Sequence, residues 1–285
     1  MTTPTTPVLS VEAVSKSYRY RSRLRRARGG REGASEVQAC RDVSLSLERG
    51  EIVALVGESG SGKSTLARMA AWLEQPDRGT IRVDGTDLRT YGRGDLRAAR
   101  ARFQMIPQDF RASLDPRWSA RRILAQPLKI HGLGQWPDMR TAVRSLLEEV
   151  DLSASLANRR VAQLSGGQCQ RLCIARAMAL RPAVVVADEA LSGLDVTTQV
   201  QVVKLIRQLR DQFGTAFLFV SHDLRTVRRL AHRVAVMYRG ELVELAATEQ
   251  VFAAPQHDYT RTLIESLLPQ RFGEATDTTE RGPVG

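Results

Sequence analysis

The sequence is poor in cysteine and has no long apolar run. Only 3 of its 285 residues are cysteine, too few for a disulfide framework and typical of a protein kept in a reducing compartment. No stretch approaches the roughly 18 consecutive apolar residues that a membrane-spanning helix requires. The opening residues Met1 to Pro4 lack the basic and apolar regions of a secretory signal. These absences predict a protein that stays in the cytoplasm and does not itself cross a membrane.

A cluster of metal ligands is also lacking. Cys169 and Cys173 lie one helical turn apart, a spacing with which two thiolates can share a metal ion. No third or fourth ligand is evident near them in the sequence, and free cysteines commonly act as small packing residues. We therefore interpret both cysteines as packing residues.

Basic residues exceed acidic ones. The chain has 42 Lys and Arg against 31 Asp and Glu, a formal net charge of +11. Arginines clustered between Arg19 and Arg31 supply much of this excess. A basic stretch can dock onto lipid or nucleic acid, but a solvated loop extension explains it more simply.

Apolar patterning predicts an α/β fold. Strands alternate with helices along most of the chain, an order that favours a parallel sheet covered on both faces. From Asp95 to about Arg160 the pattern is mainly helical, which indicates a helical subdomain inserted into that core. After about Pro269 the chain is polar and is predicted to be disordered. The predicted strands are 8–18, 40–47, 51–56, 80–83, 183–187, 216–220, 234–237 and 242–245, and the predicted helices include 64–73, 141–150, 168–180 and 197–213.

The loop from Gly57 to Ser64 carries the first chemical motif. It reads Gly-Glu-Ser-Gly-Ser-Gly-Lys-Ser between a predicted buried strand and a helix start, the context in which such a loop binds phosphate. Its glycines let backbone N–H groups point inward, and the helix N-terminus adds a favourable dipole. Lys63 is predicted to contact the β- and γ-phosphates and Ser64 to offer its hydroxyl to Mg²⁺. The predicted nucleotide-binding residues of this loop, called the phosphate loop below, are Gly57, Ser59, Gly60, Ser61, Gly62, Lys63, Ser64 and Thr65.

An acidic pair follows three valines at the end of a predicted buried strand. An isolated Asp-Glu pair is usually a solvated turn, but Asp188 and Glu189 emerge where that strand ends and precede the segment 191–195. One carboxylate in this place reaches Mg²⁺, and its neighbour can polarise an attacking water. We assign Asp188 to the metal and Glu189 to the base.

The segment Leu164-Ser165-Gly166-Gly167-Gln168, called the signature turn below, has its own local chemistry. Ser165 can cap the N-terminus of a helix, and Gln168 three residues later completes a capping box. The two intervening glycines leave N–H groups unobstructed at a positive helix end, which suits a γ-phosphate.

The phosphate loop, the signature turn and the acidic pair together resemble the ATP-binding-cassette (ABC) ATPases. The resemblance implies a P-loop NTPase core with a parallel sheet, an N-terminal antiparallel β subdomain and an inserted helical subdomain. It implies one ATP-binding domain over residues 8–269, with the helical subdomain at about 95–165 and a tail at 270–285. It also implies that two subunits meet head to tail around two ATP molecules, so that the signature turn acts on the nucleotide of the opposite subunit.

Further residues take roles from the same resemblance. His222, at the end of a strand, corresponds to the histidine that contacts the γ-phosphate and holds the attacking water. Gln108 corresponds to the glutamine that senses Mg²⁺ and links the core to the helical subdomain, although Pro107 stands where an aromatic residue is usual. Asp195 belongs to the loop that joins the two active sites. Tyr18 is a candidate for stacking on adenine, and Tyr20 competes with it.

Segments in the middle and in the C-terminal part of the chain are similar to the peptide and nickel importer branch of the family. The similarity rests on residues 240–244, 255–261 and 113–117. Ala190 stands where most relatives have proline, and this departure resembles the second ATPase subunit of nickel-type importers. The implied partners are a second ATPase subunit (a paralogue or a second copy), two membrane permeases and, indirectly, an extracytoplasmic binding protein. The chain would then lie at the cytoplasmic face of the cell membrane.

The cargo stays open in the sequence, because an importer ATPase need not touch its substrate. Dipeptides, oligopeptides, nickel and metal–chelator complexes are all possible. The alternative is a soluble ABC ATPase that acts on nucleic acid or the ribosome, and the arginine-rich stretch is its best support. Repair members of that class need long coiled-coil insertions and translation members usually carry two cassettes, so we expect no nucleic-acid partner.

Overall fold

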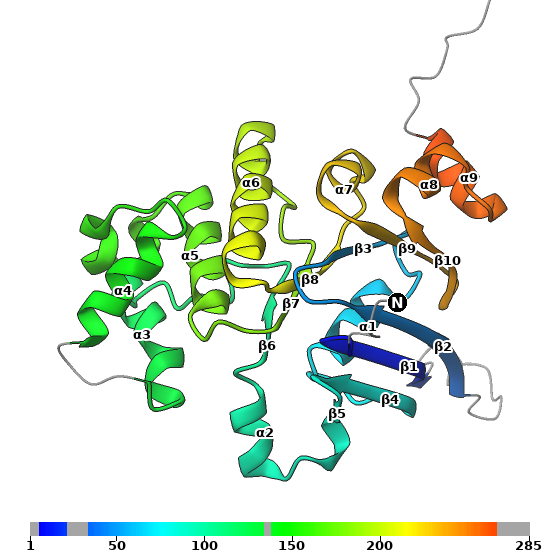
Figure 1. The fold of residues 1–285 in the computed structure, drawn as a ribbon, viewed down its shortest axis with the longest axis horizontal. Coiled ribbons are helices and arrows are strands. Elements are labelled where there is room, and N and C mark those ends of the chain that lie inside the picture. The colour runs from blue at the N-terminus through cyan, green and yellow to red at the C-terminus, as the bar shows by residue number, and fades with distance from the viewer. Residues whose placement is uncertain (1–5, 22–33, 134–137, 267–285) are drawn as a thin grey trace, which may run out of the picture.

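A mixed six-stranded sheet forms the centre of the molecule (Figure 1). The structure, a computed structural model, describes residues 6–21, 34–133 and 138–266. The strand order is β10-β9-β3-β8-β7-β6, with β10 antiparallel to β9 and the other neighbours parallel. These strands are β3 (Ile52–Val56), β6 (Phe103–Ile106), β7 (Val184–Asp188), β8 (Ala216–Val220), β9 (Arg233–Tyr238) and β10 (Glu241–Ala247). Every residue of β3, β7 and β8 is buried, as expected for parallel strands covered on both faces.

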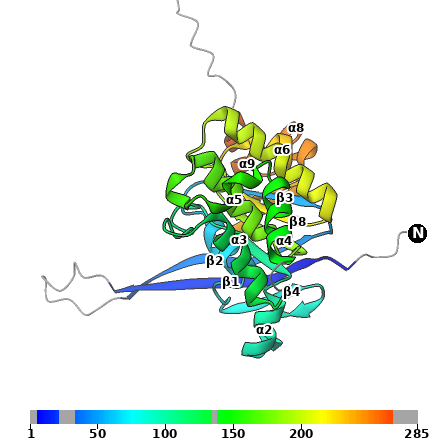
Figure 2. The same cartoon turned by 90° about the vertical axis from the view of Figure 1, so that its left-hand side faces the viewer.

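A second, antiparallel sheet has the order β2-β1-β4-β5. Its strands are β1 (Leu9–Arg21), β2 (Ala34–Leu47), β4 (Arg78–Val83) and β5 (Thr86–Asp87), and the short 3-10 turn Leu88–Thr90 follows. Figure 2 shows β1 and β2 extending together from the body as a long ribbon. Both strands are longer than the sequence predicted, and the basic stretch from Arg23 to Arg31 lies outside the described residues.

Alternate residues of the central strands pack on opposite faces, as the two-residue period of a strand requires. On one face, Val186 and Leu218 pack with Leu66 and Met69 of helix α1 (Lys63–Ala70) and with the antiparallel sheet. On the other face, β-strand residues such as Phe217 pack with α5 (Gly166–Met178) and α6 (Val196–Phe213). Helices α7 (Leu224–Leu230), α8 (Thr248–Ala253) and α9 (Asp258–Glu265) complete the C-terminal part.

The segment between β6 and β7 is helical, with α3 (Ala120–Ile130), α4 (Asp138–Glu148), the 3-10 turns Ala154–Asn158 and Val161–Gln163, and then α5. The fold class expected from the sequence is therefore confirmed. The expectation of a mainly helical stretch from Asp95 missed one element, because β6 follows α2 (Arg93–Ala99) and pairs with β7 at the sheet edge. Periodicity cannot identify a four-residue strand, since so short an apolar segment fits a helix equally well.

No helix in the described part of the chain combines the length and the apolar character needed to cross a bilayer.

Candidate active site

The phosphate loop connects β3 to α1 and lies close against neighbouring backbone. Gly57 has φ 144° and Gly62 has φ 106°, values that favour glycine. A Cβ at Gly57 would stand 2.2 Å from the carbonyl oxygen of Met237, and one at Gly62 would stand 2.1 Å from that of Ala39. Glycine is therefore required at both positions for the loop to keep this path. A glycine-rich loop of this shape can turn backbone N–H groups toward its concave side, where they can bind phosphate oxygens.

Lys63 begins α1 and points back into the loop. It is only 6% exposed, and its Nζ donates to the carbonyl oxygens of Gly57 at 2.7 Å and Glu58 at 2.6 Å. Burial lowers the pKa of Lys63, and the nearby carboxylates of Glu189 and Asp188 oppose that effect. An ammonium group has three donors, so one remains for a phosphate oxygen beyond a weaker contact of 3.4 Å to the Ser61 hydroxyl.

Asp188 and Ser64 form a pair beside Lys63. The Ser64 hydroxyl lies 3.5 Å from Asp188 Oδ1, and Asp188 is 6% exposed at the end of β7. Burial raises the pKa of Asp188, and the charge of Glu189 raises it further. A buried carboxylate next to a hydroxyl offers the hard oxygen ligands that Mg²⁺ prefers. The residues present therefore fit the predicted metal.

The three predicted catalytic side chains meet at the same edge of the sheet. Gln108 Nε2 donates to Glu189 Oε2 at 2.8 Å, and His222 Nδ1 lies 3.6 Å from Glu189 Oε1. These residues follow β6, β7 and β8 respectively. Because the three strands pair in parallel, their C-terminal ends lie side by side at one edge of the sheet. Glu189 has φ 45°, an uncommon backbone conformation for a residue other than glycine. The sequence predicted each residue separately, and the structure brings them into contact.

The signature turn forms a capped helix start. The Ser165 hydroxyl accepts from Gln168 N at 3.3 Å, and Ser165 N donates to Gln168 Oε1 at 3.0 Å. The predicted capping box is therefore confirmed. A Cβ on Gly166 would lie 3.0 Å from the Arg111 guanidinium, and one on Gly167 would lie 3.2 Å from the Thr198 side chain. A side chain at either glycine would therefore crowd the neighbouring side chain of Arg111 or Thr198.

The signature turn shares a hollow with the start of α6. It lines an open hollow of about 640 Å³ together with Asp195, and among the described residues that line it none comes from the phosphate loop. Asp195 caps α6, because its carboxylate accepts from Thr198 N at 2.9 Å and from the Thr198 hydroxyl at 2.7 Å. These hydrogen bonds lower the pKa of Asp195.

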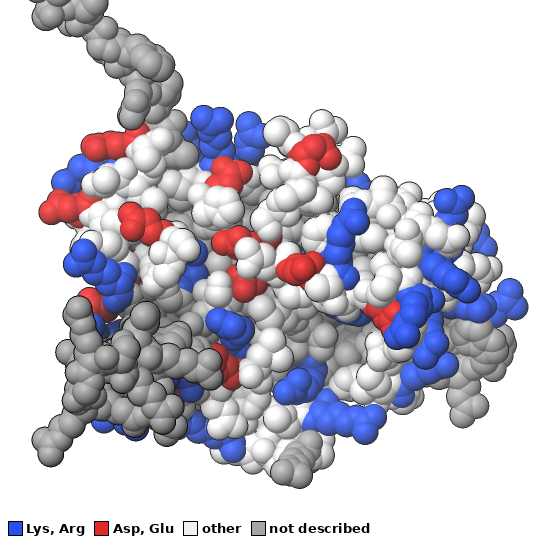
Figure 3. All heavy atoms as spheres, turned by 180° about the vertical axis from the view of Figure 1, so that it is seen from behind, with Lys and Arg blue, Asp and Glu red and all other residues white. Residues whose placement is uncertain are grey.

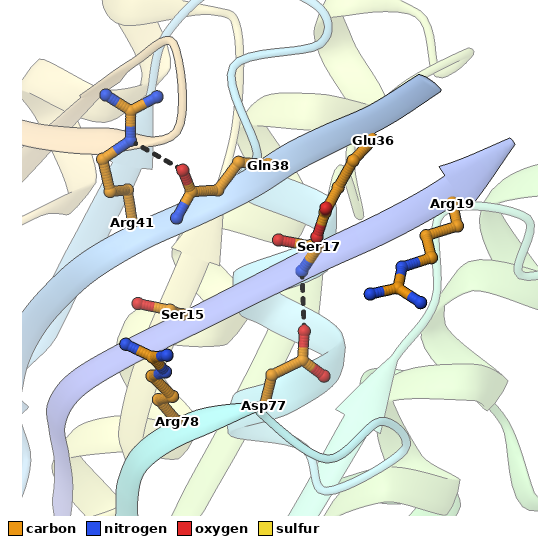
Figure 4. A pocket seen from close by; sticks show the side chains of 8 residues that line it. All are labelled: Ser15, Ser17, Arg19, Glu36, Gln38, Arg41, Asp77 and Arg78. Atoms are coloured by element: carbon orange, nitrogen blue, oxygen red, sulfur yellow. Dashed lines mark hydrogen bonds between the residues drawn. The ribbon is translucent and has the colours of Figure 1, made fainter. Parts of the chain in front are cut away.

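Tyr18 lies half-buried on β1. Its hydroxyl donates to Glu74 Oε2 at 2.6 Å, and burial raises its pKa. Asp77 holds the strand just before Tyr18, because its carboxylate accepts from Ser17 N at 2.8 Å and from Lys16 Nζ at 3.0 Å. The bond from Ser17 is visible in Figure 4, in a polar hollow of about 970 Å³ on β1 and β2. The side chain of the competing Tyr20 lies outside the described residues.

Other predicted nucleotide-binding residues differ in exposure. Ser59 and Gly60 are exposed at the tip of the phosphate loop, whereas Ser61 and Thr65 are buried. Two contacts with this loop escaped the sequence reasoning. Gly240 N donates to Ser61 O at 3.0 Å, and Glu58 N donates to the Tyr259 hydroxyl at 2.8 Å. In the sequence, Tyr259 is part of the importer-like segment 255–261. It stands 201 positions from Glu58, so no local pattern predicts their contact.

Basic side chains also gather over the helical segment between β6 and β7, at the right of Figure 3. That segment contributes Arg121, Arg122 and Lys129 from α3 and Arg140 and Arg144 from α4. The positive charge of the chain is therefore spread more widely than the arginine-rich stretch alone.

Comparison with known proteins shows which family this chain resembles. A profile described as ABC transporter matches residues 40–192. A putative peptide import ATP-binding protein of Brucella ovis is 42% identical over 262 residues, which cover 92% of this chain and 79% of that protein. The glutathione import ATP-binding protein GsiA of Salmonella choleraesuis is 46% identical over 232 residues, covering 81% of this chain and 37% of GsiA.

Solved structures give the same fold. A dimeric, post-hydrolysis state of the ATP-binding cassette MJ0796 with ADP and Pi matches with a TM-score of 0.72 and 27% identity, covering 84% of this chain and 98% of that one. The cbiO1 protein of Clostridium perfringens has the same TM-score of 0.72 at 24% identity, which supports the fold alone.

Proposed function

Since this chain belongs to the ABC transporter family and is an ATP-hydrolysing subunit, we propose that its hydrolysis drives the import of peptides through partner permeases. The observation that carries the proposal is the match along 92% of the chain to a relative named for peptide import. The alternative activity on nucleic acid or the ribosome is not favoured, because the two relatives compared are named for the import of peptides or of glutathione. We treat residues 8–269 as one ATP-binding domain.

In this proposal, the phosphate loop holds the triphosphate. Backbone N–H groups around Gly60 and the start of α1 face the phosphates, and the spare donor of Lys63 pairs with them. Ser64 and Asp188 hold Mg²⁺, which when bound neutralises charge on the phosphate oxygens. Tyr18 stacks on adenine, with its ring held by the bond to Glu74.

Glu189 acts as the base that takes a proton from the attacking water. Gln108 donates to one oxygen of its carboxylate, which leaves lone pairs of the other oxygen for water. His222 has a 68% exposed side chain, so it is free to approach a phosphate and to hold the water from the opposite side.

The lining of the signature-turn hollow suggests a paired arrangement. The signature turn and Asp195 line it without any described phosphate-loop residue, so in this proposal each chain supplies half of each of two ATP sites. A head-to-tail dimer would bring Ser165 and Gly167 of one subunit to the nucleotide of the other. The related cassette MJ0796 is described as dimeric. The partner here is a second copy or a paralogue.

The remaining partners follow from the importer role. Two permeases would receive the closing movement, an extracytoplasmic protein would deliver cargo, and the chain would sit peripherally on the cytoplasmic face of the membrane. The names of relatives favour peptides, including glutathione, over nickel or metal chelates.

An uptake experiment tests this function. In the organism that encodes the chain, deletion of its gene should abolish uptake of labelled di-, tri- or oligopeptides, and wild-type protein but not Glu189→Gln should restore it. Unchanged peptide uptake with lost nickel uptake would move the cargo to metal. Unchanged uptake of both, with tight and salt-sensitive RNA or DNA binding by the purified protein, would overturn the importer proposal.

A further inference from the structure

Tyr259 connects the C-terminal helix α9 to the phosphate loop. Its ring stacks on Tyr238 with centroids 4.2 Å apart, and its hydroxyl accepts the Glu58 N–H at 2.8 Å. The start of α9 is held in turn by Glu244, which is 8% exposed and accepts from Gln256 N at 3.0 Å and His257 N at 3.1 Å. Stacking on Tyr238 fixes the ring of Tyr259, and Glu244 fixes the start of α9, so the tyrosine hydroxyl is held in place beside the loop.

Only one peptide plane separates Tyr259 from Lys63. In a trans peptide the N–H and the preceding C=O point in opposite directions. The Glu58 N–H points outward to Tyr259, so the Gly57 carbonyl points inward, where it accepts from Lys63 Nζ at 2.7 Å. Fixing one end of this plane fixes the other.

This peptide needs an external hold. Gly57 has φ 144°, in the region that glycine enters at little cost, so the glycine itself does little to restrict rotation of the adjoining plane. Lys63 depends on the orientation of this plane, because one of its three donors binds the Gly57 carbonyl, and a second binds the Glu58 carbonyl of the following peptide.

We propose that Tyr259 is a positioning residue for Lys63: by holding the Gly57–Glu58 peptide, it keeps the lysine ammonium aimed with its third donor toward the phosphates. The inference rests on the proposed nucleotide role of the phosphate loop and not on import. Tyr259 lies outside the residues 40–192 that match the family profile. Burial raises the pKa of Tyr259, so its hydroxyl is neutral near pH 7, and it accepts the Glu58 N–H through an oxygen lone pair.

The test replaces Tyr259 by phenylalanine, which keeps the stacked ring and removes the acceptor. Arg261→Ala is the matched control, because it alters an exposed residue of the same helix whose side chain pairs with Asp258. In the full-length protein, the dissociation constants of ATP and ADP should rise about three- to tenfold in Tyr259→Phe and stay unchanged in the control. The kcat at saturating ATP should change less than about twofold, because the contact exists before the transition state.

Two further measurements separate positioning from general damage. Hydrogen exchange of the Glu58 amide in nucleotide-free protein should accelerate in Tyr259→Phe only. In a Lys63→Ala background, Tyr259→Phe should weaken nucleotide binding little further, because its route through Lys63 has been removed.

The outcomes distinguish this inference from the proposed function. If wild-type protein binds no nucleotide, the ATPase assignment itself fails. If wild-type protein binds nucleotide and Tyr259→Phe binds it equally tightly, only the role of Tyr259 is overturned. An equal loss of affinity with and without Lys63 would overturn it too, since that result describes a structural effect on the whole loop.

Discussion

Neighbouring carboxylates have different surroundings in the active site. Asp188 is buried beside the Ser64 hydroxyl, whereas Glu189 is shared between the amide of Gln108 and the imidazole of His222. A buried carboxylate gains most from a cation, while a carboxylate with free lone pairs and water nearby can accept a proton. The local environment therefore supports metal binding for one and base catalysis for the other.

Removing the base should separate ATP binding from hydrolysis. Glu189→Gln keeps the size of the side chain and loses the proton acceptor, so kcat should fall at least about 100-fold while ATP still binds. Incubation with ATP should then accumulate a dimer on size-exclusion chromatography. Glu249→Gln, an exposed change on α8, should hydrolyse ATP normally. A Glu189→Gln protein that binds ATP and remains a monomer would contradict the paired arrangement.

The adenine contact distinguishes two tyrosines. If Tyr18 stacks on the base, Tyr18→Ala should weaken ATP binding by roughly 1–3 kcal/mol, whereas Tyr18→Phe, which loses only the bond to Glu74, should keep most of the affinity. Tyr20→Ala should have little effect. Fluorescence titration with a labelled nucleotide measures all three, and a larger loss in Tyr20→Ala would assign the base to that residue.

At the scale of single elements, two helix starts carry residues proposed to bind nucleotide. α1 begins with Lys63 at the phosphate loop, and α5 begins after Ser165 at the signature turn. α3 has a similar cap, because the Ser119 hydroxyl accepts from Arg122 N at 3.3 Å. Both helices thus have a serine N-cap, but of these two serines only Ser165 lines the hollow at the signature turn.

This similarity gives an internal control for the signature turn. Ser165→Ala and Ser119→Ala should each lower the free energy of unfolding by about 0.5–2 kcal/mol, measured by urea denaturation, because each removes an N-cap. Only Ser165→Ala should also reduce the ATPase rate at saturating ATP. Equal ATPase losses in the two variants would mean that the serine of the signature turn acts only through stability.

At the scale of the whole molecule, no described phosphate-loop residue lines the hollow at the signature turn. We therefore propose that this chain completes its ATP site with the signature turn of a second chain. Its proposed catalytic unit is therefore a pair of chains, and its activity should depend on protein concentration.

Mixing two inactive variants tests the paired unit directly. Lys63→Ala disables the phosphate loop, and Gly167→Asp places a negative charge and a side chain at the signature turn, where a Cβ already lies 3.2 Å from Thr198. An equal mixture should recover up to about a quarter of the wild-type rate, because half of random dimers join unlike chains and each has one intact site. A mixture that stays inactive would show that both motifs serve the same chain or that this chain pairs only with a paralogue. Co-expression with that paralogue would distinguish these two explanations.

Much of the site could be predicted from local sequence. The phosphate loop, the capping box of Ser165 and Gln168, and the carboxylates after a valine run depend on residues within a few positions of one another, so their pattern carries the chemistry. The fold class followed from the alternation of strands and helices. The short strand β6 was missed, because its four residues have no distinctive period and form a strand only by pairing with β7.

The sequence by itself determined which residues have the chemistry for nucleotide binding and hydrolysis, because backbone freedom, capping and side-chain type are local properties. Only the tertiary structure decided which of them meet. Gln108 reaches Glu189 across 81 positions and Tyr259 reaches Glu58 across 201, and such contacts exist because a parallel sheet gathers strand ends that are remote along the chain. The absence of phosphate-loop residues from the described lining of the signature-turn hollow is likewise a result of packing, since α1 and α5 pack on opposite faces of the sheet.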